Sequence, residues 1–225
     1  MLSKEQIEQV LTASYQPQEW KQLLTHIFQQ QRAQVEWLTK PVEVIKDSKA
    51  AQYRTKSLRQ LGTVKLNDDR QLTVFEVEVQ NTQIADNRVG LRSLVQNEIV
   101  PGFADAALAV FYSAEQVAWR ITFLSKWEYP EERGKIVRHE THPKKYTYVL
   151  GPTETCRTAK EQLYLLQQGN GSLQALIDAF SVNKLSKEFF TEYRQHYQKF
   201  VEYLVDSKYR KQVFGIAKYK SKEEN

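Results

Sequence analysis

Residues 61–79 read LGTVKLNDDRQLTVFEVEV, and this stretch decides the fold class. Apolar and polar residues alternate on both sides of Asn67–Arg70, whose residue types favour a turn. Alternation with a period of two is typical of strands that bury one face. The stretch therefore predicts a β-hairpin, in which Glu76 and Glu78 share one face of an otherwise apolar second strand.

The rest of the chain predicts helices before and after a sheet. Ser3 caps an N-terminal helix, and a second helix starts after Pro17, continues to Leu38 and ends at Pro41. The apolar run 106–112 is typical of a strand covered on both faces. The remaining patterns predict a helix at 84–95, a strand at 117–127, a polar loop at 128–145, a short strand at 144–150, and helices at 158–168, 173–180 and 186–206.

This order of elements predicts an α/β (α+β) fold, in which helices flank a mixed sheet and a helical extension follows. We expect one domain over residues 1–155 and a helical linker over 156–225. The 225 residues are 41% hydrophobic and 12% aromatic, which excludes a disordered chain. The single cysteine, Cys156, excludes a disulfide scaffold and a multi-cysteine metal site.

Composition also limits the cellular setting and the chemistry. One thiol and the lack of a signal peptide indicate a reducing cytoplasm, and no apolar run reaches the roughly 20 residues that cross a bilayer. The eight glycines form neither of the common phosphate-binding loop motifs. The net charge of +5 is compatible with nucleic-acid binding without indicating it. We therefore expect a soluble, cytoplasmic protein with no membrane partner.

The acidic residues of the hairpin are the strongest sign of chemistry. Two carboxylates on one buried face repel each other and lose hydration unless a cation or basic side chains lie between them. Asp69 lies in the turn before the strand that carries Glu76 and Glu78. Such oxygen ligands suit Mg²⁺, which activates water and stabilises charge on a scissile phosphate. The alternative, favoured by spacing alone, is that the two glutamates face water or pair with Lys65 and Arg70.

Basic residues form two further candidate features. Arg88 and Arg92 lie one turn apart on an expected helix, and they could hold phosphate oxygens or neutralise the acidic strand. A later group mixes basic with aromatic residues, which suits contact with a nucleic-acid backbone, although its four glutamates fit a solvated loop equally well. The candidates for DNA contact in this group are Arg120, Lys126, Lys144 and Lys145.

Four motifs occur in order between residues 60 and 205. They are FEVEV at 75–79, NRVGLR at 87–92, THPKKYTYVLG at 141–151, and AFSV at 179–182 followed by LSKEFF at 185–190 and Tyr193. Together they resemble the N-terminal region of type IIG restriction–modification enzymes. In that family one polypeptide carries an endonuclease, an adenine-specific DNA methyltransferase and a target-recognition part.

The resemblance implies a PD-(D/E)xK nuclease-like fold for the N-terminal part and Mg²⁺-dependent hydrolysis of DNA. It implies that Asp69 (or Asp68) is the first metal ligand and Glu76 the second. Glu36, on the expected helix before the hairpin, is a further candidate ligand, although no family motif covers it. Glu78 stands where the family pattern usually has Lys. This departure fits either a site that uses Glu or an inactive domain that binds DNA. The basic residues left to stabilise the phosphate are Lys65, Arg88 and Arg92.

The 225 residues contain neither an N-P-P-Y-like tetrapeptide nor a glycine-rich S-adenosylmethionine loop. We therefore expect the front part of a larger protein or a stand-alone relative, with residues 156–225 leading towards a methyltransferase. The expected partners are double-stranded DNA and the methyltransferase and target-recognition domains of the parent chain. Three functions stay open: a Mg²⁺-dependent endonuclease of bacterial defence, an inactive nuclease-fold module that binds DNA or docks the methyltransferase, and a purely structural domain.

Overall fold

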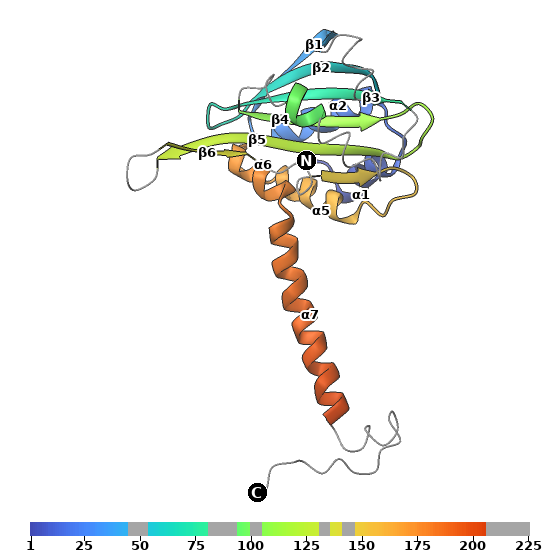
Figure 1. Ribbon diagram of the computed structural model, residues 1–225, viewed down its shortest axis with the longest axis vertical. Coiled ribbons are helices and arrows are strands. Elements are labelled where there is room, and N and C mark those ends of the chain that lie inside the picture. Colours follow the sequence, from blue (N-terminus) through green and yellow to red (C-terminus); the bar gives the residue numbers. More distant parts are fainter. Residues whose placement is uncertain (45–53, 81–93, 100–104, 131–135, 141–146, 206–225) are drawn as a thin grey trace, which may run out of the picture. The chain divides into compact units, whose positions relative to one another are not determined.

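The computed structural model describes residues 1–44, 54–80, 94–99, 105–130, 136–140 and 147–205. The chain divides into two compact units, residues 1–181 and residues 182–225. The first unit contains a sheet with helices against it (Figure 1). The second unit contains helix α7 (Val182–Val205).

The first unit is built on a mixed sheet of seven strands: β1 (Gln34–Glu43), β2 (Thr55–Lys65), β3 (Gln71–Val79), β4 (Ala106–Tyr112), β5 (Trp119–Pro130), β6 (Ile136–Glu140) and β7 (Thr147–Leu150). The strands follow the order β1-β2-β3-β4-β5-β6, and β7 also pairs with β5. β3 and β4 are parallel, whereas the other pairs are antiparallel. The expected mixed sheet flanked by helices is therefore confirmed.

The expected hairpin forms between β2 and β3. Lys65 faces Gln71 across the turn, and the backbone N–H of Leu66 donates to the carbonyl of Arg70 at 2.8 Å. Asp69 has a φ of 61°, in the left-handed region that short polar residues tolerate in turns. The prediction of a hairpin with its turn in residues 67–70 is confirmed.

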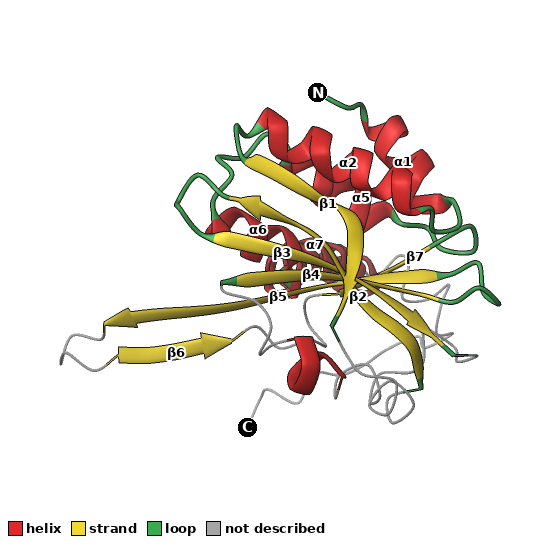
Figure 2. Cartoon of the chain, turned by 90° about the horizontal axis from the view of Figure 1, so that it is seen from above, coloured by secondary structure: helices red, strands yellow, loops and turns green. Residues whose placement is uncertain are grey.

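Helices cover one face of the sheet, and a short π-helix lies on the other (Figure 2). In β3, Leu72 and Val74 belong to the helix-covered core, whereas Phe75 and Val77 pack with Val95 of the π-helix. β3 is therefore covered on both faces, so that charged side chains in it lose water. The elements are α1 (Lys4–Thr12), α2 (Pro17–Gln30), α5 (Arg157–Leu166), α6 (Leu173–Phe180) and the π-helix η1 (Val95–Ile99).

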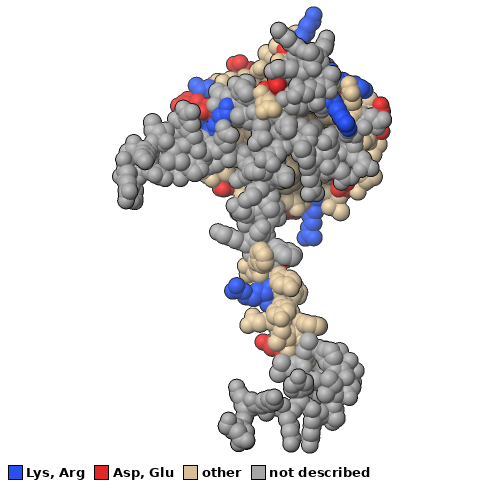
Figure 3. Space-filling view, viewed as in Figure 1, with Lys and Arg blue, Asp and Glu red and all other residues tan. Residues whose placement is uncertain are grey.

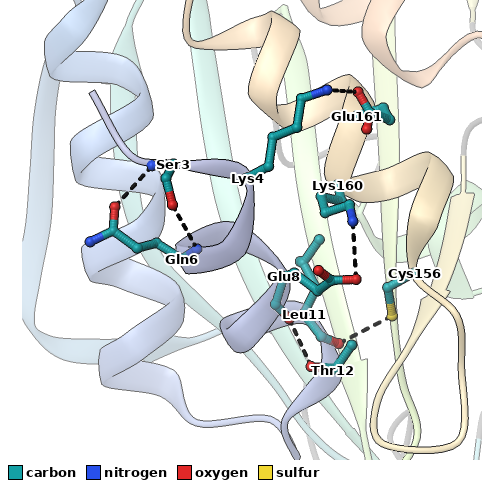
Figure 4. A network of polar contacts seen from close by, with 9 residues as sticks. All are labelled: Ser3, Lys4, Gln6, Glu8, Leu11, Thr12, Cys156, Lys160 and Glu161. Atoms are coloured by element: carbon teal, nitrogen blue, oxygen red, sulfur yellow. Dashed lines mark hydrogen bonds and ion pairs between the residues drawn. The ribbon is translucent and has the colours of Figure 1, made fainter.

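Polar contacts fix α1 to α5 (Figure 4). Ser3 caps α1 as predicted, and the thiol of the buried Cys156 donates to the carbonyl of Leu11 at 3.3 Å. A cysteine that donates inside the core in this way is a packing residue. Two ion pairs add to the contact, Lys4–Glu161 at 2.5 Å and Lys160–Glu8 at 3.0 Å.

The boundary between the two units lies after Ser181, whereas the sequence led us to expect it after residue 155. Leu163 of α5 and Phe180 of α6 belong to the same core as Trp20 of α2. The ring of Phe180 stacks on Phe123 of β5 with the centroids 5.3 Å apart. The two helices expected in the linker are therefore part of the first unit.

Two other elements differ from expectation because strand pairing decides them. α2 ends at Gln30 rather than Leu38, since Arg32 turns the chain with a φ of 61° and Gln34–Glu43 pair with β2. The segment 128–145, expected as a loop, contains the end of β5 and all of β6. Pairing with a neighbouring strand overrides local propensity, and a polar pattern does not reveal it.

Two further helices were expected, one near the middle of the chain and one near its end. The helix expected at 84–95 meets the described residues only at 94 and 95, the latter being the start of η1. The helix expected at 186–206 is confirmed as α7. Within the part of the chain that the structure describes, no helix has the length and apolar character needed to span a bilayer.

Gly62 permits the close approach of β1 to β2. We therefore expect a substitution at Gly62 to lower the stability of the fold. A Cβ atom at Gly62 would collide with the carbonyl oxygen of Glu36 and the ring of Trp37. Gly62→Ala should therefore lower the free energy of unfolding by about 2–3 kcal/mol, measured by urea denaturation. Thr63→Ala, at the next position of the same strand, is the control and should cost about 1 kcal/mol or less. Equal losses in the two variants would contradict this explanation.

Candidate functional site

The acidic candidates of the hairpin lie in two separate places. Glu76 and Glu78 project from β3 on the helix-covered face of the sheet. Asp69 lies in the turn before β3, and the five steps from Gln71 to Glu76 alone span about 17 Å. The structure therefore brings Glu76 and Glu78 together and leaves Asp69 apart from both.

Glu76 is a buried carboxylate with a partner on each oxygen. Its side chain is 3% exposed, and its Oε1 lies 2.5 Å from Nη2 of Arg59. Its Oε2 accepts a hydrogen bond from the hydroxyl of Tyr15 at 2.9 Å. Arg59 is its direct neighbour in β2, and Tyr15 belongs to the loop between α1 and α2. The ion pair and the hydrogen bond replace the hydration that the carboxylate loses on burial.

Tyr112 completes the group around Arg59. Nη2 of Arg59 donates to the hydroxyl of Tyr112 at 3.0 Å, and the rings of Tyr112 and Tyr15 lie 4.8 Å apart. Tyr112 ends β4, which runs parallel to β3, and it lies in register with Glu78. Ligands of open α/β sheets commonly bind at the carboxyl ends of parallel strands. We call Tyr15, Arg59, Glu76 and Tyr112 the Glu76 cluster.

A cavity of about 330 Å³ adjoins the Glu76 cluster. Tyr15 and Tyr112 line it together with Trp119, whose ring lies 5.4 Å from that of Tyr15. Ser14 and residues 113–118 form the other walls. Because hydrogen bonds within the cluster hold both tyrosine hydroxyls, the aromatic wall of the cavity is fixed.

The surroundings shift the ionisation of three members of the cluster. Burial, followed by the Glu76 carboxylate, raises the pKa of Tyr112 to about 12. The same two causes, in the same order, raise the pKa of Tyr15 well above its usual range. Burial disfavours the charge of Arg59, but the Glu76 carboxylate and Tyr112 outweigh burial and raise the pKa of the guanidinium. Both phenols are therefore protonated at neutral pH and act as hydrogen-bonding groups, not as general bases.

Glu78 has a partner of its own. Nζ of Lys56 lies 3.2 Å from Oε1 of Glu78, and both side chains are partly exposed. On the other side of β2, Glu43 faces Arg59 in register and accepts a backbone N–H of β2 at 2.9 Å. Two basic side chains thus lie among the three glutamates of neighbouring strands, which reduces the repulsion between them.

Lys65 and Asp69 lie at the other end of the hairpin and on the opposite face. Lys65 pairs with Gln71, and the odd-numbered positions of β3 face away from Glu76. Nζ of Lys65 lies 3.3 Å from Oδ1 of Asp69, whose side chain is 90% exposed. An exposed pair of this kind contributes little free energy. Both residues line a polar depression of about 330 Å³, and its other lining residues are Gln34, Glu36, Thr63 and Gln71.

Asp68 contacts a helix. Its Oδ2 accepts the backbone N–H of Leu173, the first residue of α6, at 2.8 Å. Its neighbour Asn67 donates to the carbonyls of Gln31 and Asn170 at 2.5 and 2.7 Å. A carboxylate at this position satisfies a free N–H group and interacts favourably with the helix dipole. The turn therefore anchors α6 to the hairpin.

The described residues do not fit the Mg²⁺ site expected from Asp69, Glu76 and Glu78. One ion needs all its oxygen ligands within about 2.1–2.6 Å, whereas Asp69 lies at the far end of β3. Arg59 also occupies the space beside Oε1 of Glu76. Glu36, the further candidate ligand, lies on β1 rather than on a helix and belongs to the group around Asp69. Among the described residues, no three His, Cys, Asp or Glu side chains form a metal-binding group.

The basic candidates for DNA contact are described only in part. Arg120 is 6% exposed and lies in register with Phe111, on the face of the sheet opposite the helices. Lys126 is half-buried and faces Glu140 of β6 in register. On the face drawn in Figure 3, Lys and Arg side chains lie among Asp and Glu side chains. Four candidates lie outside the described residues: Arg88, Arg92, Lys144 and Lys145.

Sequence reasoning missed Arg59 and Tyr15, the two partners of Glu76. If the register of residues 62–65 continued along β2, Gln60 would lie opposite Glu76. A bulge between Gln60 and Gly62 instead shifts the pairing by one residue. Arg59 then faces Glu76. The glycine was the only local signal of this irregularity. Tyr15 carries no comparable signal, because it reaches Glu76 across 61 residues of sequence.

Comparisons with known proteins identify no relative of the chain. The chain matches no protein-family model, no curated protein and no solved structure.

The Arg59–Glu76 pair should be important for stability. Arg59→Met leaves the Glu76 carboxylate buried without its cation and should lower the free energy of unfolding by about 3 kcal/mol, measured by urea denaturation. Adding Glu76→Leu should restore most of this loss, because no buried charge is then left. Lys56→Met, which breaks the more exposed pair with Glu78, is the control and should cost less than about 1 kcal/mol. A double variant as unstable as Arg59→Met would contradict the assignment.

The two aspartates of the turn should differ although they are adjacent. Asp68→Ala removes the acceptor for the first N–H of α6 and should cost about 1 kcal/mol of unfolding free energy. Asp69→Ala breaks only an exposed pair and should change stability by less than about 0.5 kcal/mol. Thermal unfolding of the two variants in parallel tests this. The interpretation fails if Asp69→Ala is the more destabilising change.

Proposed function

We propose that the chain is a nuclease-like α/β module of a DNA restriction–modification protein. It binds double-stranded DNA or docks the methyltransferase of its parent protein, without hydrolysing DNA through Asp69, Glu76 and Glu78. The observation that carries this proposal is the environment of Glu76, the residue expected as second metal ligand. An arginine and a tyrosine of the chain itself occupy its two oxygens.

Two observations support the restriction–modification part of the proposal. The four motifs that resemble type IIG enzymes occur in order between residues 60 and 205. The acidic motif FEVEV lies on β3, a strand of the mixed sheet that is covered on both faces. The net charge of +5 adds long-range attraction to a polyanion.

The departures from the nuclease pattern support binding over cleavage. Glu78 stands where the pattern usually has Lys, and its partner is Lys56 of β2. Asp69 pairs with Lys65 on the other face of the sheet. The guanidinium of Arg59 supplies the positive charge that a cation would supply in a metal site. The cluster is therefore neutralised without an ion.

Mg²⁺-dependent hydrolysis of DNA is the second candidate, and one observation favours it. Glu76 and Glu78 share one face near the carboxyl end of β3, beside the end of the parallel strand β4. Binding sites of open sheets commonly lie there. For this candidate to hold, Glu76 would have to exchange Arg59 for an ion.

Metal titration, DNA binding and plasmid nicking together test the proposal. We expect calorimetric titration with Mg²⁺ or Mn²⁺ to give the same weak heats for the unaltered chain and for Glu76→Gln. We expect duplex DNA to bind with an affinity that falls about tenfold or more between 50 and 200 mM salt, because phosphate contacts release counterions. We expect no metal-dependent nicking of supercoiled plasmid.

The control variant is Glu19→Gln, which removes an exposed carboxylate from the first turn of α2, outside both cavities. Nicking that needs Mg²⁺, is lost in Glu76→Gln and survives in Glu19→Gln would favour the second candidate over the first. Failure to bind DNA at low salt would contradict the DNA-binding part.

A further inference from the structure

Helix α7 carries an exposed aromatic stripe, formed by Phe190, Tyr193, Tyr197 and Phe200. These side chains are 64%, 55%, 56% and 58% exposed. Val201 and Tyr203 are also exposed and lie beside the stripe. Single exposed apolar residues are ordinary on a protein surface, whereas a continuous apolar patch marks an interaction site.

The spacing of the stripe indicates what kind of partner fits it. Its members follow one another at intervals of three, four and three residues. This spacing matches the a and d positions over one and a half heptads, which lie on one side of a helix and form the seam where two helices pack. The seam lies on one side only, since Gln195 and Glu202, both at position f, are polar. The partner is therefore a second helix with a matching seam.

We propose that this partner is α7 of a second copy of the chain, so that the protein forms a symmetric dimer through the stripe. Each aromatic side chain buries 150–250 Å² when fully covered. Together with Val201 and Tyr203, the exposed parts of the stripe provide about 600 Å² on each helix, or about 1,200 Å² in a pair. This area reaches the lower limit of stable protein interfaces.

The stripe is also compatible with a two-fold axis. The rings of Tyr193 and Tyr197 lie 6.2 Å apart and within 18° of parallel, so they stack on each other within the stripe. A two-fold axis through the stripe places each patch against its own copy. Tyrosine suits this position, because its ring packs in the interface while its hydroxyl reaches water at the edge. The dimer is independent of DNA binding and of the Glu76 cluster.

The experiment is sedimentation equilibrium of the full chain from low to high micromolar concentration. We expect a reversible monomer–dimer equilibrium. Phe200→Lys should weaken the dimer about a hundredfold, because each dimer loses two buried rings and gains two buried charges. Gln195→Lys adds the same charge on the polar side of α7 and should leave the equilibrium unchanged. Lysine has a higher helix propensity than phenylalanine, so the helix itself should persist.

Three outcomes would overturn the proposal. The chain could stay monomeric at the highest concentration, in which case the stripe covers or meets something other than a second copy. The dimer could be insensitive to Phe200→Lys, which would place the interface elsewhere. Gln195→Lys could weaken the dimer as much as Phe200→Lys, which would indicate a general charge effect. Tyr193→Lys, with far-UV circular dichroism to confirm the helix, repeats the test at a second seam position.

Discussion

The burial of the Glu76 carboxylate is the constraint to which its surroundings at the centre of the sheet are matched. β3 is covered on both faces, so a carboxylate in it is stable only with a cation and further hydrogen bonds. The bulge in β2 brings Arg59 opposite Glu76, and Tyr15 brings the loop between α1 and α2 to the second oxygen. One buried carboxylate thereby contacts both a neighbouring strand and a loop that is distant in sequence.

This dependence explains which parts of the fold could be predicted. The hairpin, the turn at 67–70 and the doubly covered run 106–112 follow from local alternation and apolar content, which report burial directly. The end of α2 and the strand pairing of 126–130 with 136–140 depend on partners elsewhere in the chain, which one sequence does not identify. The same holds for the site. Alternation places Glu76 beside Glu78, but a one-residue bulge places Arg59 rather than Gln60 opposite Glu76.

The partners of the carboxylates also bear on function. The resemblance to restriction–modification enzymes rests on residue types in order, and residue types do not fix which groups meet. Asp69 and Glu76 are seven residues apart in sequence, yet the extended strand separates them by more than any single ion can bridge. A strand can therefore carry acidic residues in an order that resembles a metal site while an arginine neutralises one of them. Whether such a motif is catalytic depends on its neighbours in the adjoining strands.

The two units differ in the exposure of their aromatic residues. In the first unit, Trp20, Trp119 and Phe180 are buried and join helices to the sheet. In the second, the side chains of the stripe on α7 are 55–64% exposed. A single helix buries apolar surface only against another element. Under the proposed dimer, the aromatic residues of the two units therefore serve different purposes, since those of the first unit join its own elements and those of α7 join two copies of the chain.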